Sequence, residues 1–288
     1  MMSKLLFSIL IPSWNNLPYL QTCIKSIRRN STYAHQIIVH VNEGNDGTRQ
    51  WLAQQPEVQF TSSATNVGVC FALNQSAALA TCDYLVYLND DMYVCPGWDE
   101  FLFEEIQAVG HNRFFLSATA IERVPQSTCS IQGDFGKDLS SFEEERLLRE
   151  FRALPMTDWQ GATWPPNVVH RELWHLVGGY SIEFSPGMYS DPDFSMKLWQ
   201  AGVRVFKGIS RSRVYHFGSV SVKRIKKNEG YYTFIRKWGI TSSTLSKYYL
   251  RRGETYDGAL KNPVLPGLVV FKNLIKRVGA VLRAGQLP

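Results

Sequence analysis

The stretch that decides the fold is Leu85-Val86-Tyr87-Leu88-Asn89-Asp90-Asp91-Met92. Its first half is apolar and rich in β-forming residues, and its second half places an amide beside two carboxylates. The pattern predicts a buried strand whose carboxyl end carries a polar cluster. Adjacent carboxylates repel each other unless a cation lies between them, and such hard oxygen ligands suit Mg²⁺ or Mn²⁺. By itself, an acidic pair of this kind fits a solvated loop better than a metal site.

Strand and helix patterns alternate upstream of this stretch. Continuous apolar runs at residues 5–11 and 36–41 predict buried strands, and residues 17–28 between them carry a helical apolar stripe. A second helix and strand follow, up to residue 61, and a third helix begins at Asn66-Val67-Gly68. Four strands that alternate with helices predict an α/β protein with a Rossmann-like, mostly parallel sheet flanked by helices.

Polar loops follow three of the predicted strands, at residues 12–16, 42–46 and 89–91. Ligands of open α/β sheets bind beyond the carboxyl ends of the strands. We therefore expect the three loops to converge on one crevice, which weakens the interpretation of the acidic pair as a solvated loop.

The second half of the chain is less regular. Residues 114–120 predict a fifth strand, residues 168–176 a short helix, and residues 203–207 and 213–216 two short strands. The loop at residues 158–166 is rich in aromatic residues, Gly and Pro. Its two tryptophans either line a pocket with flat apolar surfaces or anchor the core.

Composition narrows the class of protein. The chain has 288 residues, of which 44% are hydrophobic and 19% charged, as in a globular domain. No stretch approaches the roughly 20 uncharged apolar residues that span a bilayer, and the first eleven residues lack a small-residue cleavage site. Five scattered cysteines predict reduced thiols without a disulfide framework or zinc site. We therefore expect a cytoplasmic protein.

Charge divides the chain into two parts. Residues 1–219 hold 17 Lys+Arg against 22 Asp+Glu, whereas residues 220–288 hold 14 against 3. We predict a domain at residues 1–219 and a basic, mainly helical C-terminal extension at residues 220–288, with a basic cluster at Lys223–Lys227.

The last helix of the extension is predicted to be amphipathic. Leu268, Phe271, Ile275, Val278 and Leu282 share one helical face, away from the lysines and arginines. A basic amphipathic helix suits an anionic membrane surface, which would make the protein peripheral on the inner membrane face. The alternative is that the apolar face packs on the catalytic domain. No nucleic-acid-binding module accompanies the charge, so no nucleic acid is expected.

Two further polar positions have alternative interpretations. Asp191 precedes Pro192 at the predicted start of a helix, where it is either an N-cap or a carboxylate that takes a proton from a hydroxyl. His216 ends a predicted strand and gains interest only beside a metal site.

Taken together, the motifs resemble those of the family 2 glycosyltransferases, which have the GT-A fold. The resemblance covers roughly residues 5–219. Its segments, in chain order, are Ser8–Asn15; Ile37–Val39 with Asn42 and Asp46-Gly47-Thr48; Asn66-Val67-Gly68 with Asn74; Leu88-Asn89-Asp90-Asp91; Gly178-Gly179-Tyr180; Asp191-Pro192-Asp193; and His216-Phe217-Gly218-Ser219.

The resemblance implies a metal-dependent, inverting transfer of a sugar from a nucleotide diphosphate sugar to an acceptor hydroxyl, as in polysaccharide biosynthesis. It makes Asp91 the direct ligand of Mn²⁺ or Mg²⁺, with Asn89 and His216 as further ligands, and lets Asn89 or Asp90 contact the ribose or a metal-bound water. Asn89 replaces the first carboxylate of the family motif, so we expect a weaker metal site.

The resemblance also assigns the base and the nucleotide contacts. Asp191 would deprotonate the acceptor, supported by Asp193. The nucleotide would lie against two sets of residues. They are Pro12, Trp14 and Asn15 in the first loop, and Asn66 and Gly68 in a later one. At the end of the second strand, Asn42 and Glu43 would also contact the nucleotide. Relatives commonly have two acidic residues there. The resemblance as a whole therefore favours a UDP-sugar, but these two positions do not support that preference.

Three functions remain in competition at this point. The first is the glycosyltransferase, acting on a glycan, polysaccharide or lipid-linked acceptor. The second is a non-catalytic nucleotide- or sugar-binding module on the same fold. A nucleotidyltransferase is the third, and the absence of a Gly-rich phosphate loop after the first strand disfavours it.

Overall fold

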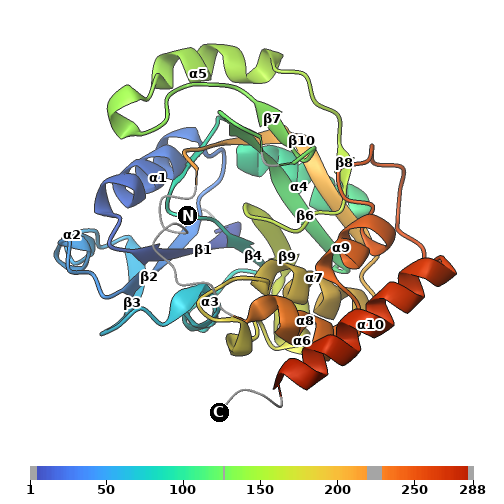
Figure 1. Ribbon diagram of the computed structural model, residues 1–288. Coiled ribbons are helices and arrows are strands. Elements are labelled where there is room, and N and C mark those ends of the chain that lie inside the picture. The colour runs from blue at the N-terminus through green and yellow to red at the C-terminus, as the bar shows by residue number, and fades with distance from the viewer. Residues whose placement is uncertain (1–4, 126, 219–228, 285–288) are drawn as a thin grey trace.

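The computed structural model describes residues 5–125, 127–218 and 229–284 (Figure 1). One ten-stranded sheet runs through these residues in the order β3-β2-β1-β4-β9-β6-β10-β5, with β7 paired to β6 and β8 paired to β10. The strands are β1 (Phe7–Trp14), β2 (Gln36–Asn42), β3 (Val58–Ser63), β4 (Tyr84–Tyr87), β5 (Met92–Val94), β6 (Phe114–Glu122), β7 (Ser130–Gln132), β8 (Trp159–Gln160), β9 (Asn167–His170) and β10 (Val205–His216).

The first half of the sheet confirms the predicted α/β fold. Strands β1 to β4 pair in parallel, with Ile9 opposite both Ile37 and Val86. Alternate residues of these strands enter different cores: Ile9 and Val86 join one hydrophobic cluster, and Leu10 joins the other. Both faces are therefore buried, which explains the unbroken apolar runs in the sequence.

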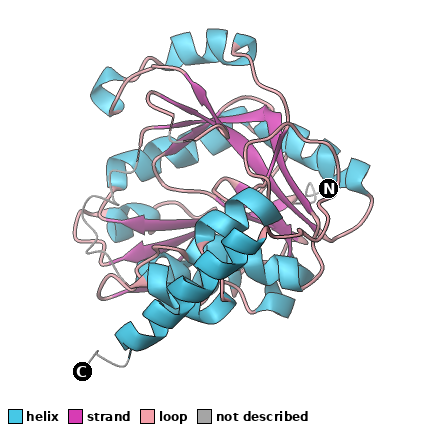
Figure 2. Cartoon of the chain, turned by 45° about the vertical axis from the view of Figure 1, so that its right-hand side comes forward, coloured by secondary structure: helices cyan, strands magenta, loops and turns pink. Residues whose placement is uncertain are grey.

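Helices cover both faces of the sheet (Figure 2). The first cluster is completed by α1 (Leu17–Asn30), α2 (Thr48–Leu52) and α4 (Trp98–Val109). The second is completed by α3 (Gly68–Ala77), α6 (Arg171–Val177) and α7 (Ser190–Gln200). A third, smaller cluster lies beneath α5 (Glu144–Glu150) and the 3₁₀ turn η2 (Phe151–Ala153). Two further 3₁₀ turns are η1 (Leu139–Ser141) and η3 (Ile182–Phe184).

The second half of the sheet corrects two predictions. Residues 167–170 form β9, antiparallel between β4 and β6, so the predicted helix over residues 168–176 begins only at Arg171. Val168 and Val169 enter the two opposite cores, a two-residue alternation that a short apolar run conceals. The two predicted strands at residues 203–207 and 213–216 are one strand, β10, with a register irregularity between Ile209 and Arg213.

The polar end of the quoted stretch lies between two strands. Strand β4 ends at Tyr87, and Met92 starts β5, which pairs antiparallel with the end of β10. Met92 is opposite His216, and Phe217 N donates to Asp91 O at 3.2 Å. This register brings His216 beside Asp91, 125 positions earlier in the chain.

The C-terminal part of the described chain is helical and shares a core with the rest. It contains α8 (Gly230–Trp238), α9 (Ser242–Thr244), the π-helical turn η5 (Leu245–Tyr249) and α10 (Gly267–Ala284). Phe234, Ile240, Leu245, Leu250 and Leu260 all join the second cluster. The basic cluster Lys223–Lys227 and the boundary between residues 219 and 220 lie outside the described residues, so the division at that boundary stays a prediction.

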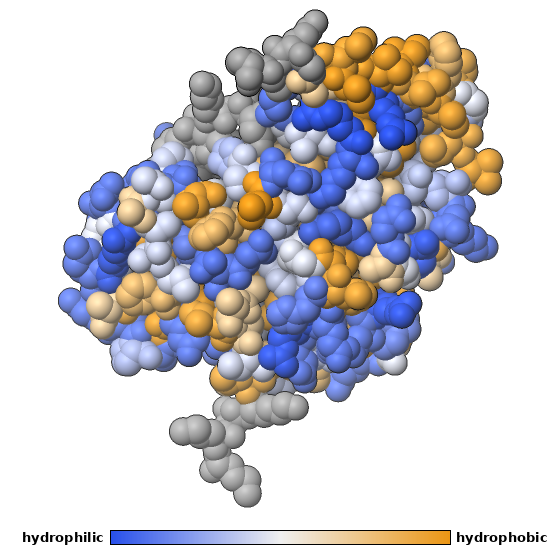
Figure 3. All heavy atoms as spheres, turned by 90° about the horizontal axis from the view of Figure 1, so that it is seen from below, coloured by the Kyte–Doolittle hydropathy of each residue, from blue (hydrophilic) through white to orange (hydrophobic). Residues whose placement is uncertain are grey.

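Helix α10 exposes its apolar face. Eight of its apolar side chains retain between 51% and 74% of their accessible surface: Leu268, Val270, Phe271, Leu274, Ile275, Val278, Val281 and Leu282. They form the hydrophobic patch at the upper right of Figure 3. The helix contacts the body through Asn273 and Ala280 instead: Asn273 Oδ1 accepts from Thr244 Oγ1 at 3.0 Å, and Ala280 is buried. The interpretation that the apolar face packs on the domain is therefore wrong.

No helix in the described ranges is both long enough and apolar enough to cross a bilayer.

Candidate active site

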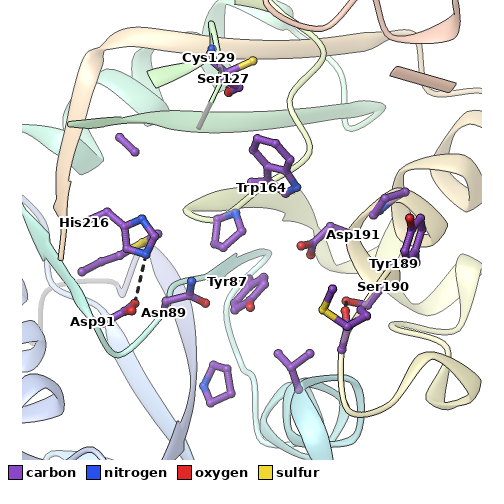
Figure 4. A pocket seen from close by; sticks show the side chains of 18 of the residues that line it. Tyr87, Asn89, Asp91, Ser127, Cys129, Trp164, Tyr189, Ser190, Asp191 and His216 are labelled. Atoms are coloured by element: carbon purple, nitrogen blue, oxygen red, sulfur yellow. Dashed lines mark hydrogen bonds and ion pairs between the residues drawn. The ribbon is translucent and has the colours of Figure 1, made fainter. Parts of the chain in front are cut away.

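A pocket of about 860 Å³ opens at the carboxyl ends of β1, β2 and β4 (Figure 4). The start of α7, the end of β10 and part of the C-terminal segment complete its walls. The expected convergence of three polar loops on one crevice is thus observed. Ten of the residues named from the sequence line it: Pro12, Trp14, Asn42, Asn66, Gly68, Asn89, Asp90, Asp91, Asp191 and His216.

Asp90 joins the first loop to the acidic pair. Ser13 Oγ donates to its Oδ2 at 2.7 Å, and Asn16 Nδ2 donates to its Oδ1 at 3.1 Å. Asp90 is 5% exposed, so both carboxylate oxygens are occupied in a nearly closed environment. The geometry suits positioning of the loop better than the ribose contact that we expected from the sequence.

Asp91 and His216 face each other in the pocket (Figure 4). Glu122 Oε1 lies 2.8 Å from His216 Nδ1, which leaves Nε2 aimed at Asp91 Oδ1 across 3.6 Å. No described residue hydrogen-bonds to either of these two atoms, although both are buried. Burial opposes the charged form of His216, but the carboxylates of Asp91 and Glu122 outweigh it and raise the pKa of His216 well above its ordinary value.

The residues present fit a divalent cation. Within residues 5–125, 127–218 and 229–284, no three His, Cys, Asp or Glu side chains gather as a metal-binding group. However, Asp91 Oδ1 and His216 Nε2 are an oxygen and a nitrogen ligand with no other partner, and the Asn89 side chain lies on the same wall. In metal sites, a histidine ligand is typically held in place by a carboxylate that binds its other ring nitrogen, as Glu122 binds Nδ1 of His216.

Asp191 enters the pocket from the first turn of α7. The helix begins at Ser190 with Tyr189 as N-cap, so the predictions of Asp191 as N-cap and Pro192 as first residue are wrong. Tyr189 has a left-handed φ of 70°, and its carbonyl accepts the first helical bond, from Asp193 N at 3.2 Å. Pro192 is tolerated because an amide in the first turn has no partner within the helix.

The surroundings of Asp191 hold its proton. Tyr180 OH donates to Asp191 Oδ1 at 3.2 Å. Burial raises the pKa of Asp191 to about 7, and the Tyr180 hydrogen bond opposes part of that rise. Tyr180 is itself fixed by Asn74, which donates to its carbonyl at 2.7 Å and accepts from its N–H at 2.9 Å. A carboxylate near neutral pKa in a pocket is suited to proton transfer.

Asp193 does not line the pocket. It is fully buried on the other side of α7, where Ser181 Oγ donates at 2.7 Å, Trp238 Nε1 at 2.8 Å and Lys237 Nζ lies at 2.9 Å. These contacts join α7 to α8. The structure therefore places Asp193 as an anchor for the C-terminal helices, away from the site in which we expected it to support Asp191.

The loops expected to bind a nucleotide are held by their own polar groups. Asn42 Oδ1 accepts from Val67 N at 2.9 Å, and Asn66 Oδ1 accepts from Gly68 N at 2.9 Å. Gly68 has a φ of +80°, and a Cβ there would lie 2.6 Å from Pro186 Cα. Only glycine fits this contact, through which the Asn66–Gly68 loop supports the segment before α7.

The glycosyltransferase motifs that line this pocket agree with a similarity of the sequence to a known protein family. Residues 8–127 match the model of the family described as Glycosyl transferase family 2. This part of the chain is thus similar to the family 2 glycosyltransferases. The matched range includes β1, β2 and the Asn89-Asp90-Asp91 turn, and ends before Asp191 and His216.

Two curated relatives of this chain are glycan synthases by name. Chondroitin synthase of Pasteurella multocida (strain Pm70) is 20% identical over 269 residues, which are 89% of this chain and 25% of that protein. Hyaluronan synthase of Pasteurella multocida is 23% identical over 239 residues, which are 77% of this chain and 22% of that protein. The chain thus spans a quarter or less of the length of these relatives.

Solved structures share the GT-A fold of this chain. S. aureus TarS 1–349 in complex with UDP has a TM-score of 0.59 at 13% identity, over 95% of this chain and 71% of that one. GalNAc-T7 with UDP, GalNAc and Mn²⁺ has a TM-score of 0.56 at 17% identity, over 80% of this chain and 45% of that one. The likeness confirms the fold expected from the sequence.

Two residues expected to contact the nucleotide are not among those that line the pocket. Asn15 Nδ2 donates to Glu43 Oε2 at 2.9 Å, and Asn15 Oδ1 accepts from Asn45 N at 2.8 Å. Both Asn15 and Glu43 have left-handed backbones, with φ of 46° and 61°. They tie the first two loops to each other.

The two tryptophans of the aromatic loop have different environments. Trp159 is 5% exposed, donates from Nε1 to Thr119 Oγ1 at 2.9 Å and lies over Gly208, where a Cβ would collide with its ring. Trp164 lies less deeply and presents its ring to the pocket, with the Arg252 guanidinium 4.0 Å above the ring centre. Both tryptophans therefore line the pocket, and Trp159 is a core anchor as well.

Several residues at this site were not identified from the sequence. Ser13 and Asn16 lie in the polar loop at residues 12–16, and Tyr180 lies in the Gly178-Gly179-Tyr180 segment. Their positions in these motifs are the signal from which a role at the site could have been inferred. Glu122 lies two residues beyond the predicted end of its strand, and Arg252 lies in a basic stretch with no motif. Nothing in the sequence indicates that these two residues reach the pocket.

Proposed function

We propose that this chain is an inverting glycosyltransferase that uses a nucleotide diphosphate sugar, with Asp191 as the base. The proposal rests on one observation: the same pocket holds Asp191, whose pKa is near 7, and the two residues Asp91 and His216, which face each other. The match of residues 8–127 to the family model and the UDP complexes of the fold neighbours support it.

Asp191 accepts the proton of the acceptor hydroxyl as that oxygen attacks the anomeric carbon of the donor sugar. The bond between the anomeric carbon and the diphosphate oxygen breaks on the opposite face, and the nucleoside diphosphate leaves with the electron pair. Asp191 must be deprotonated to do this, and its pKa near 7 leaves a base that is both available and strong enough at neutral pH. Tyr180 keeps the carboxylate oriented from behind.

Asp91, His216 and Asn89 would hold Mn²⁺ or Mg²⁺ at the pocket. When bound, the cation neutralises negative charge on the diphosphate leaving group. Glu122 orients His216 so that Nε2 faces Asp91, and Asp90 holds the first loop against the same turn through Ser13 and Asn16. Asn89 contributes no charge, so we expect modest cation affinity before the nucleotide binds.

UDP is our proposed nucleotide, because fold neighbours were solved with UDP and with UDP-GlcNAc. Pro12, Trp14, Asn42 and Asn66 provide one flat ring, one proline and two amides at the end of the pocket nearest β1 and β2. Asn42 Oδ1 accepts a hydrogen bond from Val67 N, so its side-chain NH₂ group is the part that can donate to a nucleotide base. A glycan acceptor, as in polysaccharide biosynthesis, is proposed from the names of the two relatives. A lipid-linked acceptor stays an expectation from the resemblance alone.

Nucleotide release tests this proposal. We expect the intact chain with Mn²⁺ to release nucleotide from at least one member of a panel of sugar nucleotides, and Asp91→Ala to lose this release. Release by Asp91→Ala at the wild-type rate, or no release from any donor, would exclude the enzyme. Tight nucleotide binding by calorimetry without turnover would favour the non-catalytic binding module.

We further propose that α10 binds the anionic, cytoplasmic face of a membrane. Its exposed apolar face is flanked by the exposed Lys272, Lys276 and Arg277, and no Asp or Glu follows Asp257 in the sequence. Apolar insertion combined with attraction to anionic lipid is the usual basis of such binding. Arg283 is excluded from this set because it pairs with Glu229 at 3.0 Å.

Vesicle sedimentation tests the membrane proposal. The triple variant Leu268→Ser, Phe271→Ser, Ile275→Ser alters only exposed side chains, so the fold should persist. We expect the wild type to sediment with phosphatidylglycerol-containing vesicles and not with pure phosphatidylcholine, and the triple variant to lose this binding. Equal sedimentation of both proteins would contradict it, and concentration-dependent dimerisation abolished by the same variant would assign the face to a second copy instead.

A further inference from the structure

The pocket continues past the proposed reaction centre to a wall formed by the C-terminal segment. Ser242, Ser243, Ser246, Lys247 and Arg252 line it there, opposite Trp164. The backbone of this segment is locked onto β8: Gly253 N donates to Gln160 O at 3.0 Å, and a Cβ on Gly161 would lie 2.7 Å from Arg252 Cα. The backbone that carries Arg252 is thus held against the end of β8.

The neighbouring residues Arg251 and Arg252 differ in their ion pairs within the described residues. Arg251 is neutralised on the surface by Glu254 at 2.7 Å and by Asp257 at 2.9 Å. Arg252 points the other way, into the pocket, where its guanidinium stacks on Trp164 and pairs with no carboxylate in the described part of the chain. Burial lowers the pKa of Arg252, yet a guanidinium remains charged at neutral pH.

The position of Arg252 separates it from the expected diphosphate. Trp164 contacts β6, since its carbonyl accepts from Ser117 Oγ at 3.0 Å, and β6 lies two places beyond β4 in the sheet. The nucleotide loops belong to β1 and β2, on the other side of β4. In Figure 4, Trp164 lies above Tyr87 and Asp191, whereas Asn89 and Asp91 lie below and to the left. Trp164, on which Arg252 stacks, therefore lies on a different wall of the pocket from Asn89 and Asp91.

We propose that the acceptor carries an anionic group, a carboxylate or a phosphate, which binds Arg252 and Lys247 at this end of the pocket. An uncompensated, half-buried guanidinium is stabilised by an anion that it can contact through two N–H groups, and both groups offer two suitable oxygens. The serines of the same wall are placed to bind sugar or polyol hydroxyls. This inference rests on the proposed function, because it names the acceptor class of the same site.

Equilibrium binding in the presence of UDP tests the inference. The probes are a uronic-acid-containing tetrasaccharide, the same tetrasaccharide after reduction of its carboxyl groups, and an oligomer of glycerol phosphate. We expect at least one anionic probe to bind the wild type more tightly than the neutral tetrasaccharide. Arg252→Gln should weaken that binding by roughly tenfold to a hundredfold, and Lys247→Gln, an exposed change, by about threefold.

Arg251→Gln is the matched control, because it removes a neighbouring charge that is already paired, and it should leave binding of every probe unchanged. A carboxylate acceptor and a phosphate acceptor are distinguished by which anionic probe responds to Arg252→Gln. Equal binding of charged and neutral probes, no binding of either anionic probe, or wild-type binding by Arg252→Gln would overturn the inference.

Binding of UDP alone separates this inference from the proposed function. Arg252→Gln should bind UDP as the wild type does, and loss of UDP affinity in that variant would assign Arg252 to the donor and also overturn the inference. Anionic-probe binding that depends on Arg252, in a protein that releases nucleotide from no donor, would support the anionic subsite while rejecting the transferase.

Discussion

Two carboxylates on the first turn of α7, two residues apart, have opposite environments. Asp191 faces the pocket, has the Tyr180 hydroxyl as its hydrogen-bond donor, and has a pKa raised by burial to about 7. Asp193 is enclosed on the other side and receives Ser181, Lys237 and Trp238. The same residue type is left under-solvated in one place and is fully satisfied in the other.

The helix itself produces this difference. Residues two apart on a helix point to nearly opposite sides, so one carboxylate meets the pocket when the other meets α8. We infer that the under-solvated carboxylate performs the proton transfer and that the satisfied one maintains the fold. The following variants test that division of roles.

The largest expected effect is on turnover. Asp191→Asn should lower the rate of sugar transfer by roughly a hundredfold to ten-thousandfold, because it removes the proposed base while preserving shape. Asp193→Asn should leave the rate constant of the folded fraction within a small factor of wild type. Nucleotide release under saturating donor measures both. Equal losses in the two variants would contradict the division.

A smaller loss should follow from disturbing the segment before α7. Gly68→Ala places a Cβ against the Pro186 backbone and should shift the start of α7, which carries Asp191. We expect this shift to lower turnover by roughly tenfold to a hundredfold. Gly178→Ala is the matched control, since Gly178 has a φ of +73° but no atom within 4 Å of the added Cβ. If both variants lose the same activity, left-handed strain and not the contact with Pro186 is responsible.

The smallest effects are on stability and have opposite signs. Asp193→Asn should lower the free energy of unfolding by about 1–2 kcal/mol, because Lys237 loses the buried one of its two carboxylate partners and keeps only Glu183. Asp191→Asn should raise it at pH 8. Chemical denaturation of both variants in parallel measures these changes.

The sign for Asp191 follows from its pKa. The folded-state pKa is raised above the ordinary carboxyl value, so the fold favours the protonated form. That contribution is fully present below about pH 4 and is lost as the pH rises through about 7. Asn cannot lose a proton, so the variant should not share the loss. A destabilised Asp191→Asn at pH 8 would indicate that the carboxylate is satisfied by contacts other than Tyr180.

Local sequence patterns predicted the parts of the fold that depend on near neighbours. The alternation of strands and helices up to β4 follows from apolar runs separated by turn residues, and the three polar loops follow from the parallel order of those strands. Strand β9 was missed because its four residues run directly into α6 and are too few to distinguish a strand from the start of that helix.

The partners of the site residues depend on distant pairings. Glu122 and His216 are 94 positions apart and meet because β6 and β10 pair in one register. Asp193 meets Trp238, 45 positions later, because α8 packs on α7. Neither contact has a local pattern, so the role expected for Asp193 came from its motif alone and its actual contacts could not be foreseen.

The pH dependence of kcat/KM for sugar transfer tests the central claim most directly. If Asp191 is the base, the logarithm of kcat/KM should rise with a slope near one below about pH 7 and level off above it, with the same inflection in Asp193→Asn. A profile that is flat from pH 5 to pH 8 in the wild type would contradict the assignment of Asp191.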